Sequence, residues 1–200
     1  MMDETLRRYY EEMRRQYARE DPWSYGSNLY EKARHAVMIE FALDGSPRSV
    51  LDLGCGEGHF LARLLAREPG LHATGVELIS EAAERCRARL AGYDAFILTA
   101  GLQDFLADPP AGLRADVVIC GDVLFMLPPE IVSARVVPGI ADLLPPEGRL
   151  VISSAGLHDD KRWTVDAFAG RFRLIKEVHL QPLLDRPPCT WYISLLNKVE

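Results

Sequence analysis

The sequence predicts an α/β protein built on a doubly wound, mostly parallel sheet of seven strands, with an antiparallel hairpin at its C-terminal edge. From residue 50 onward, short apolar runs alternate with helical patterns, which is typical of parallel α/β sheets. Runs such as "DVVIC" are continuously apolar, as expected of strands buried on both faces. The tail differs, because "FRLIKEVHL" and "TWYISLLNKV" are strand-like runs joined by "QPLLDRPPC".

The apolar runs place five strands before this hairpin. We expect them at residues 49–53, 72–77, 94–99, 116–120 and 148–154. Helical periodicity appears between them, at about 58–67, 80–91 and 129–144. Pro128 and Pro129 suit the first turn of the last helix, whereas Pro138 lies inside it and predicts a kink.

The N-terminal 45 residues form a separate helical segment in this prediction. An apolar stripe at helical spacing marks a first helix over residues 3–19; it comprises Leu6, Tyr9, Tyr10, Met13 and Tyr17. Asn28 suits the N-cap of a second helix that runs to about Leu43, with Glu31 completing a capping box. We therefore divide the chain into lid helices at residues 1–45 and one compact domain at residues 46–200.

Composition limits the classes of partner and compartment. The net charge of −6 argues against a partner that is a nucleic acid or an acidic membrane. The cysteines are scattered and form no CxxC pair, which suits a reducing compartment. No apolar run approaches the roughly 20 residues of a membrane span. We expect a cytoplasmic protein without a metal.

The stretch "VLDLGCGEGHF", at residues 50–60, is the most informative of the sequence. A glycine-rich turn after a strand usually holds the pyrophosphate of a dinucleotide. Here His59 stands where the third glycine of that motif belongs, and Asp52 and Glu57 would repel a phosphate. The acids instead favour a cationic ligand without phosphates, such as S-adenosylmethionine. Glu77, at the end of the second strand, suits the ribose hydroxyls of either ligand.

"VLDLGCGEG", followed by "GVEL" and "ADVVICGDVLFML", resembles the class I S-adenosylmethionine-dependent methyltransferases. The resemblance implies a Rossmann-like fold, S-adenosyl-L-methionine as cofactor and S-adenosyl-L-homocysteine as product. It places Glu77 on the ribose hydroxyls, Leu78 on the adenine and Gly121 beside the methionine portion. It also implies two further groups of cofactor contacts: Asp52, Gly54, Cys55 and Gly56 along the methionine and ribose, and Leu102, Gln103 and Asp104 at the adenine edge. Either Gln103 or Asp104 substitutes for the acid common in that loop.

The leader "DPWSYGSNLYEKARHAVMI" resembles that of the small rhizobial nodulation N-methyltransferases. Those enzymes methylate an amine on a chitooligosaccharide, so the resemblance implies a small-molecule amine acceptor, such as an amino sugar or a natural-product intermediate. "CGDVLFMLP" is also similar, although Asp122 stands where glutamate is common. Trp23, Tyr25 and Tyr30 offer aromatic faces to a sulfonium; alternatively they pack the leader onto the core.

Methyl transfer from a sulfonium needs few catalytic groups. The leaving group is already activated, so catalysis consists mainly of bringing donor and acceptor together. A base is required only where the acceptor carries a proton. The candidates are Asp122 after the fourth strand, His35 in the second leader helix and His158 after the fifth strand. The plain alternatives are a helix cap for Asp122, a packing residue for His35 and a loop residue for His158.

Several alternatives stay open. O-methylation of a small hydroxyl or carboxyl substrate competes with N-methylation. From other classes of function, a non-catalytic cofactor-binding subunit and an NAD-type oxidoreductase remain as alternatives. A nucleic-acid base acceptor is disfavoured because "GDVL" replaces the N/D-P-P-Y/F motif. Phe125 and Met126 stand where a metal-assisted RNA methyltransferase would carry ligands. The acceptor's identity and the oligomeric state do not follow from the sequence.

Overall fold

A computed structural model describes residues 4–157, 162–181 and 189–199, and its centre is a seven-stranded sheet. The strands are β1 (Ser49–Leu53), β2 (His72–Glu77), β3 (Ala95–Thr99), β4 (Val117–Gly121), β5 (Arg149–Leu157), β6 (Phe172–Leu180) and β7 (Cys189–Lys198). Their order is β3-β2-β1-β4-β5-β7-β6, and β7 runs antiparallel to both of its neighbours. The predicted fold class and C-terminal hairpin are confirmed, and β1 to β5 each begin within one residue of the predicted start.

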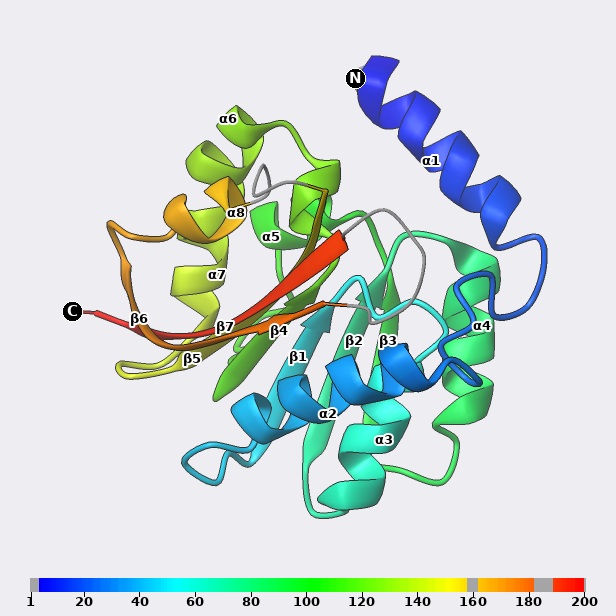
Figure 1. The fold of residues 1–200 in the computed structure, drawn as a ribbon, viewed down its shortest axis with the longest axis horizontal. Coiled ribbons are helices and arrows are strands. Elements are labelled where there is room, and N and C mark those ends of the chain that lie inside the picture. The colour runs from blue at the N-terminus through cyan, green and yellow to red at the C-terminus, as the bar shows by residue number, and fades with distance from the viewer. Residues whose placement is uncertain (1–3, 158–161, 182–188, 200) are drawn as a thin grey trace.

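Helices cover both faces of the sheet (Figure 1). They are α1 (Glu4–Gln16), α2 (Leu29–Ala42), α3 (His59–Arg67), α4 (Ser80–Arg89), α5 (Leu102–Ala107), α6 (Pro129–Ile131), α7 (Val137–Leu143) and α8 (Trp163–Asp166), with a 3-10 turn η1 (Leu124–Met126) and a π-helical turn η2 (Val132–Val136). One core packs α2, α3 and α4 against the sheet; it includes Met38, Leu61, Leu64, Cys86, Val50 and Ile119. A second core packs α5, η2, α7 and α8 against the other face; it includes Phe105, Val136, Ile140, Phe168, Leu51 and Val118.

The predicted helix at 129–144 is divided into three pieces. It starts at Pro129 as expected, but a π-helical turn occupies Val132–Val136 before α7 resumes. Pro138 lacks an N–H, and its ring clashes with the carbonyl four residues earlier in a regular helix. The wider π turn directly before Pro138 accommodates both effects. Residues 102–107, which we expected to act as a loop, form the short helix α5.

The predicted cap of the second leader helix is present. Asn28 Oδ1 accepts the Tyr30 N–H at 2.9 Å. The capping box is different, because the Glu31 carboxylate accepts from the guanidinium of Arg34, 2.8 Å away. Glu31 is thereby directed toward the interior. Among the described residues, no helix is long and apolar enough to span a membrane.

The turn after β1 depends on glycine. Gly54, Gly56 and Gly58 have φ values of 82°, 55° and 76°, in the left-handed region that disfavours side chains. Crowding adds to this at Gly58, where a Cβ would lie 2.7 Å from Cys86 Sγ. The first two amides of the turn donate to the carbonyl of Val76 on β2. The turn is thus held directly beside the end of β2.

We expect Gly58→Ala to lower the free energy of unfolding by about 3 kcal/mol, because backbone strain of roughly 1–2 kcal/mol adds to overpacking. Gly112→Ala is the matched control, since Gly112 also has a left-handed φ of 78° but nothing within 4 Å of the added methyl. It should cost only about 1 kcal/mol. Urea unfolding of both variants measures the difference. Equal losses would show that contact with Cys86 does not restrict the turn.

Candidate active site

A cavity of about 800 Å³ lies at the carboxyl ends of β1, β2 and β4, which is the edge where open α/β sheets bind ligands. The sheet contributes Asp52, Gly54, Cys55, Gly56, Glu77, Leu78, Gly121 and Asp122 to its lining, and the segment around α5 contributes Leu102, Gln103 and Asp104. The leader contributes Tyr9, Met13, Tyr17, Trp23, Tyr25, Glu31, Arg34, His35 and Met38. Strand ends and leader therefore enclose one common space.

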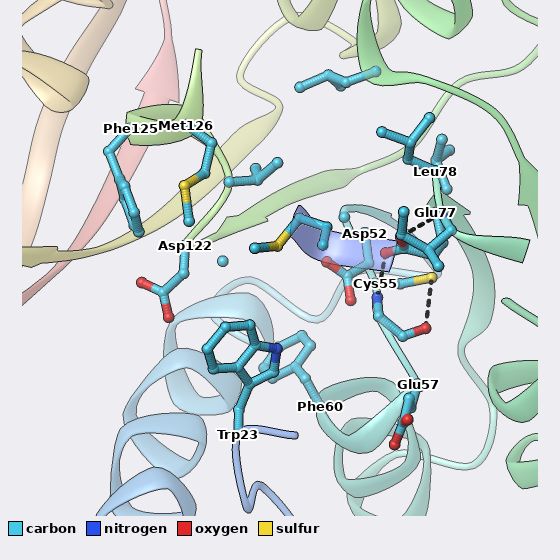
Figure 2. Close-up of a pocket in the computed structure, with 18 of the residues that line it drawn as sticks. Trp23, Asp52, Cys55, Glu57, Phe60, Glu77, Leu78, Asp122, Phe125 and Met126 are labelled. Carbon is cyan, nitrogen blue, oxygen red and sulfur yellow. Dashed lines mark hydrogen bonds between the residues drawn. The ribbon is translucent and has the colours of Figure 1, made fainter. Parts of the chain in front are cut away.

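Glu77 anchors one end of this cavity (Figure 2). Its side chain is buried, Oε2 accepts the Gly56 N–H at 2.9 Å, and Oε1 accepts the Ile79 N–H at 2.8 Å. Burial raises the pKa of Glu77, although these backbone N–H groups act in the opposite direction. A carboxylate oxygen accepts more than one hydrogen bond. Glu77 can therefore accept hydroxyl donors from a ligand while it holds the glycine turn.

Asp52 lies on β1, beside the same turn. It is buried, and burial followed by the neighbouring Glu77 carboxylate raises its pKa to about 7. Two neighbouring carboxyl groups disfavour each other's ionised form. A cationic ligand beside them would stabilise the ionised carboxylates, whereas a pyrophosphate would destabilise them.

Glu57, the second acid of the glycine turn, makes contacts with the leader and with α4 that its sequence position did not indicate. The Glu57 carboxylate accepts the Asp21 N–H at 2.9 Å and the Arg85 Nε–H at 2.7 Å. These partners already satisfy its charge. Glu57 therefore fastens the leader to the glycine turn. It also lines the cavity, so its attraction for a cationic ligand together with Asp52 stays a prediction.

The predicted adenine contacts gather on one side of the cavity. Leu78, Leu102, Gln103 and Asp104 all line it, between the end of β2 and the first turn of α5. Cys55 also lines it, but its Sγ lies 3.8 Å from Cys86 Sγ, and hydrogen bonding to Cys86 together with burial raises its pKa. A buried thiol with a raised pKa suits a packing residue.

The leader approaches the glycine turn more closely than the sequence indicated. A Cβ on Gly56 would lie 2.9 Å from the hydroxyl oxygen of Tyr17. Tyr9 and Tyr17 come from the apolar stripe of the first helix, whose spacing predicted burial but not the partner. Trp23 lines the cavity, whereas Tyr30 is not among its lining residues. Tyr30 donates to the Leu180 carbonyl and packs on Trp191 at a ring distance of 4.8 Å.

The opposite end of the cavity is built around Asp122. Figure 2 shows its carboxylate between Trp23 on one side and Phe125 and Met126 on the other. Asp122 Oδ2 lies 2.7 Å from Arg34 Nη1, and the same guanidinium pairs with Glu31. Sequence reasoning did not identify Arg34. The only signal was the Glu31-x-x-Arg34 spacing, which places both side chains on one helix face.

Of the two histidines proposed as catalytic candidates, His35 can be placed in the structure. His35 lines the cavity, but it is buried beside Arg63, and burial with the neighbouring Arg34 and Arg63 lowers its pKa far below the usual range. Its ring packs edge-on against Phe60 at 5.5 Å. His35 is therefore a neutral side chain in a packed environment. His158 lies outside the described residues.

One group of side chains has ligand atoms close enough for a metal. Among the described residues, Asp21, Glu57 and His59 offer atoms within 4.8 Å of one another. Arg85 and Arg89 pair with Glu57 at 2.7 and 4.0 Å, so their charges oppose a further cation. Burial also lowers the pKa of His59, with Arg89 as the next cause. We interpret the group as an ion-pair cluster that joins leader and turn.

The strand order, the glycine turn and the acid at the end of β2 together define the Rossmann-like fold of the class I S-adenosylmethionine-dependent methyltransferases. The family model for nodulation protein S (NodS) matches residues 7–180. The chain belongs to the NodS family.

Individual relatives agree with this assignment. Nodulation protein S of Rhizobium tropici is 30% identical over 158 residues, which are 77% of this chain and 63% of the relative. The chain thus matches less than two thirds of that relative's length. The crystal structure of N-methyltransferase NodS from Bradyrhizobium japonicum WM9 with S-adenosyl-l-homocysteine superposes with a TM-score of 0.82 at 20% identity, covering 99% of this chain and 100% of that one. An O-methyltransferase family protein from Burkholderia thailandensis reaches 0.65 at 20% identity, covering 92% and 61%.

Proposed function

We propose that the protein transfers a methyl group from S-adenosylmethionine to an amine on a small molecule. The observation that carries this proposal is a single cavity with two chemically distinct ends. Glu77 and Asp52 lie beside the glycine turn at one end, and the Asp122–Arg34–Glu31 group lies at the other. Family membership favours nitrogen over oxygen as the acceptor atom, because the relative from Bradyrhizobium japonicum is named an N-methyltransferase.

The residues at the first end fit this cofactor. Glu77 keeps acceptor capacity for two ribose hydroxyls, and Leu78 offers an apolar face for adenine. Burial, followed by the neighbouring Glu77 carboxylate, raises the pKa of Asp52, and the sulfonium and ammonium groups would favour its ionised form. The same features disfavour a nicotinamide dinucleotide, since its pyrophosphate would meet both carboxyl groups.

S-adenosylmethionine, held by Glu77, Asp52 and the glycine turn, would supply an activated methyl group to the amine, and neutral S-adenosylhomocysteine would be the leaving group. The protein has to bind the acceptor, orient it and let it lose a proton before attack. Asp122 is the proposed partner of the acceptor nitrogen. We assign residues 1–45 the part of a lid, supported by the contacts of Tyr17 and Asp21 with the turn. His35, neutral and packed, is less suited to take the proton than Asp122.

Calorimetry and an acceptor panel test the proposal. We expect S-adenosylmethionine and S-adenosylhomocysteine to bind with micromolar dissociation constants, and NADH to bind at least 100-fold more weakly. Turnover should follow with primary amines, such as glucosamine and phenethylamine, and not with the matched alcohols. A folded sample that binds neither sulfur ligand would overturn the proposal. Binding without turnover on any amine or alcohol would favour a non-catalytic subunit, and turnover on the alcohols alone would favour O-methylation.

We also propose that the protein acts in the cytoplasm, without nucleic-acid or membrane partners. The net charge of −6 and the free thiols of Cys55, Cys86 and Cys120 support this setting. Localisation of a tagged chain tests it.

A further inference from the structure

Arg34 occupies the point where three parts of the chain meet. Its side chain is 3% exposed; Nε and Nη2 bind Glu31 Oε2 at 2.9 and 2.8 Å. Nη1 lies 2.7 Å from Asp122 Oδ2 and donates to Ser153 Oγ at 2.9 Å. One guanidinium therefore links the leader helix α2 with the residue that follows β4 and with the middle of β5.

The backbone of Asp122 supports a dedicated role for this contact. Its φ is 56°, a left-handed conformation that is uncommon for residues other than glycine. Such conformations persist where the surroundings determine them, and they cluster at functional sites. The Asp122 N–H donates to the Ser153 carbonyl at 2.9 Å. Backbone and carboxylate are thus both fixed, the backbone by β5 and the carboxylate by Arg34 together with the Ser153 hydroxyl, which donates to Oδ1 at 3.4 Å.

The charges at this end of the cavity leave a negative excess. Two carboxylates, Glu31 and Asp122, share one buried guanidinium. Of the other ionisable groups in the described lining near them, His35 is neutral and Tyr25 is kept protonated, mainly by burial. Arg135 also lines the cavity, but it is exposed to solvent. Arg63 interacts with Glu31 and contacts His35, but it is not among the lining residues. This end therefore favours a cationic group on its ligand.

We propose that Arg34 is a positioning residue, which holds the Asp122 carboxylate toward the point where methyl donor and acceptor nitrogen meet. The inference rests on the proposed function and names a residue that acts through another. Arginine is required because its planar fork binds Glu31 on one edge while Nη1 reaches Asp122 and Ser153. A lysine would keep the charge but lose this simultaneous set of contacts.

A cofactor analogue tests the positioning role of Arg34 without knowledge of the methyl acceptor. Sinefungin carries a primary amine on carbon in place of the methylsulfonium group, so it presents an ammonium where the methyl would be transferred. S-adenosylhomocysteine is the neutral reference for the same site. The ratio of their two dissociation constants, measured by calorimetry at pH 7.5, reports the carboxylate near the transferred methyl. A general loss of folded protein affects both constants alike and cancels in the ratio.

We expect the wild-type protein to prefer sinefungin, and Asp122→Asn to reduce that preference at least tenfold. Arg34→Lys should reduce it at least fivefold, and the double variant should be no worse than Asp122→Asn alone. Arg87→Lys is the matched control. Arg87 also makes several hydrogen bonds, to Ile97 O and Thr99 Oγ1, but it does not line the cavity. Its ratio should change less than twofold.

The outcomes separate the inference from the proposed function. A wild-type protein that binds neither ligand contradicts both. A wild-type protein that binds both ligands while Arg34→Lys keeps the full preference contradicts only the role of Arg34. If Arg34→Lys does not fold, Ser153→Ala replaces it, because it removes the hydroxyl that accepts from Arg34 Nη1 and donates to Asp122 Oδ1 at 3.4 Å, and so loosens the same group of contacts. A two- to threefold fall in the ratio then supports the inference, and an unchanged ratio overturns it.

Discussion

Glu77→Gln is expected to weaken binding of S-adenosylhomocysteine about 100-fold. The carboxylate can bond both ribose hydroxyls, and hydrogen bonds to a charged group contribute roughly 1.5–3 kcal/mol each. A glutamine keeps one acceptor oxygen and presents an NH₂ group at the other position. The loss of about 2.7 kcal/mol corresponds to about 100-fold in the dissociation constant, which calorimetry measures directly.

A second ligand makes this experiment specific. The 2′-deoxy analogue of S-adenosylhomocysteine lacks one of the two hydroxyls, so the substitution should weaken its binding much less. Glu84→Gln is the matched protein control, because Glu84 is an exposed residue on α4. An equal loss for both ligands would show that Glu77 acts through the fold and not through the ribose. That possibility is real, since Glu77 also accepts the N–H groups of Gly56 and Ile79.

These backbone contacts revise what the sequence led us to expect of Glu77. Position alone, at the end of β2, indicated a ligand contact. The structure adds that the same carboxylate ties the glycine turn to the start of α4. Glu77→Ala would therefore leave two buried N–H groups without their acceptor, which costs about 1–3 kcal/mol for each group. Glutamine, which keeps part of this bonding, is the better test.

The sheet was predictable because its signals are local. Continuous apolar runs bounded by charged or turn residues located β1 to β5, and the glycine turn identified the ligand edge. The division of the helix at 129–144 was only partly predictable from the sequence. Pro138 predicts a disturbance, but the choice of a π turn depends on how Val132 and Val136 pack in the second core.

The Asp122 end of the cavity was not predictable in the same way. Arg34 owes its importance to Asp122 and Ser153, which lie 88 and 119 residues away in the chain. Sequence spacing reveals only its partner Glu31. Asp122 was found because it follows a strand, yet its left-handed backbone and its ion pair depend on the register between β4 and β5, where Gly121 pairs with Ser153.

Asp52→Asn is expected to stabilise the ligand-free protein, and to do so more strongly as the pH rises. Burial, followed by the Glu77 carboxylate, raises the pKa of Asp52 from 3.8 to about 7. Below about pH 4 both the folded and the unfolded state hold the proton, so this group has no net effect. Between about pH 4 and 7 only the folded state holds it, and stability falls as the pH rises. Above pH 7 the penalty is constant, on the order of 4 kcal/mol.

Asparagine resembles the protonated carboxyl and does not titrate, so it removes this penalty. The difference in unfolding free energy between Asp52→Asn and wild type should grow by about 2–3 kcal/mol from pH 5 to pH 8. Urea unfolding at four pH values in that range measures it, with the exposed Asp142→Asn as the control. A difference that stays constant would mean that Asp52 is already ionised in the free site. A growing difference would mean that the protein keeps a destabilised carboxyl group beside the glycine turn, which a cationic ligand can stabilise on binding.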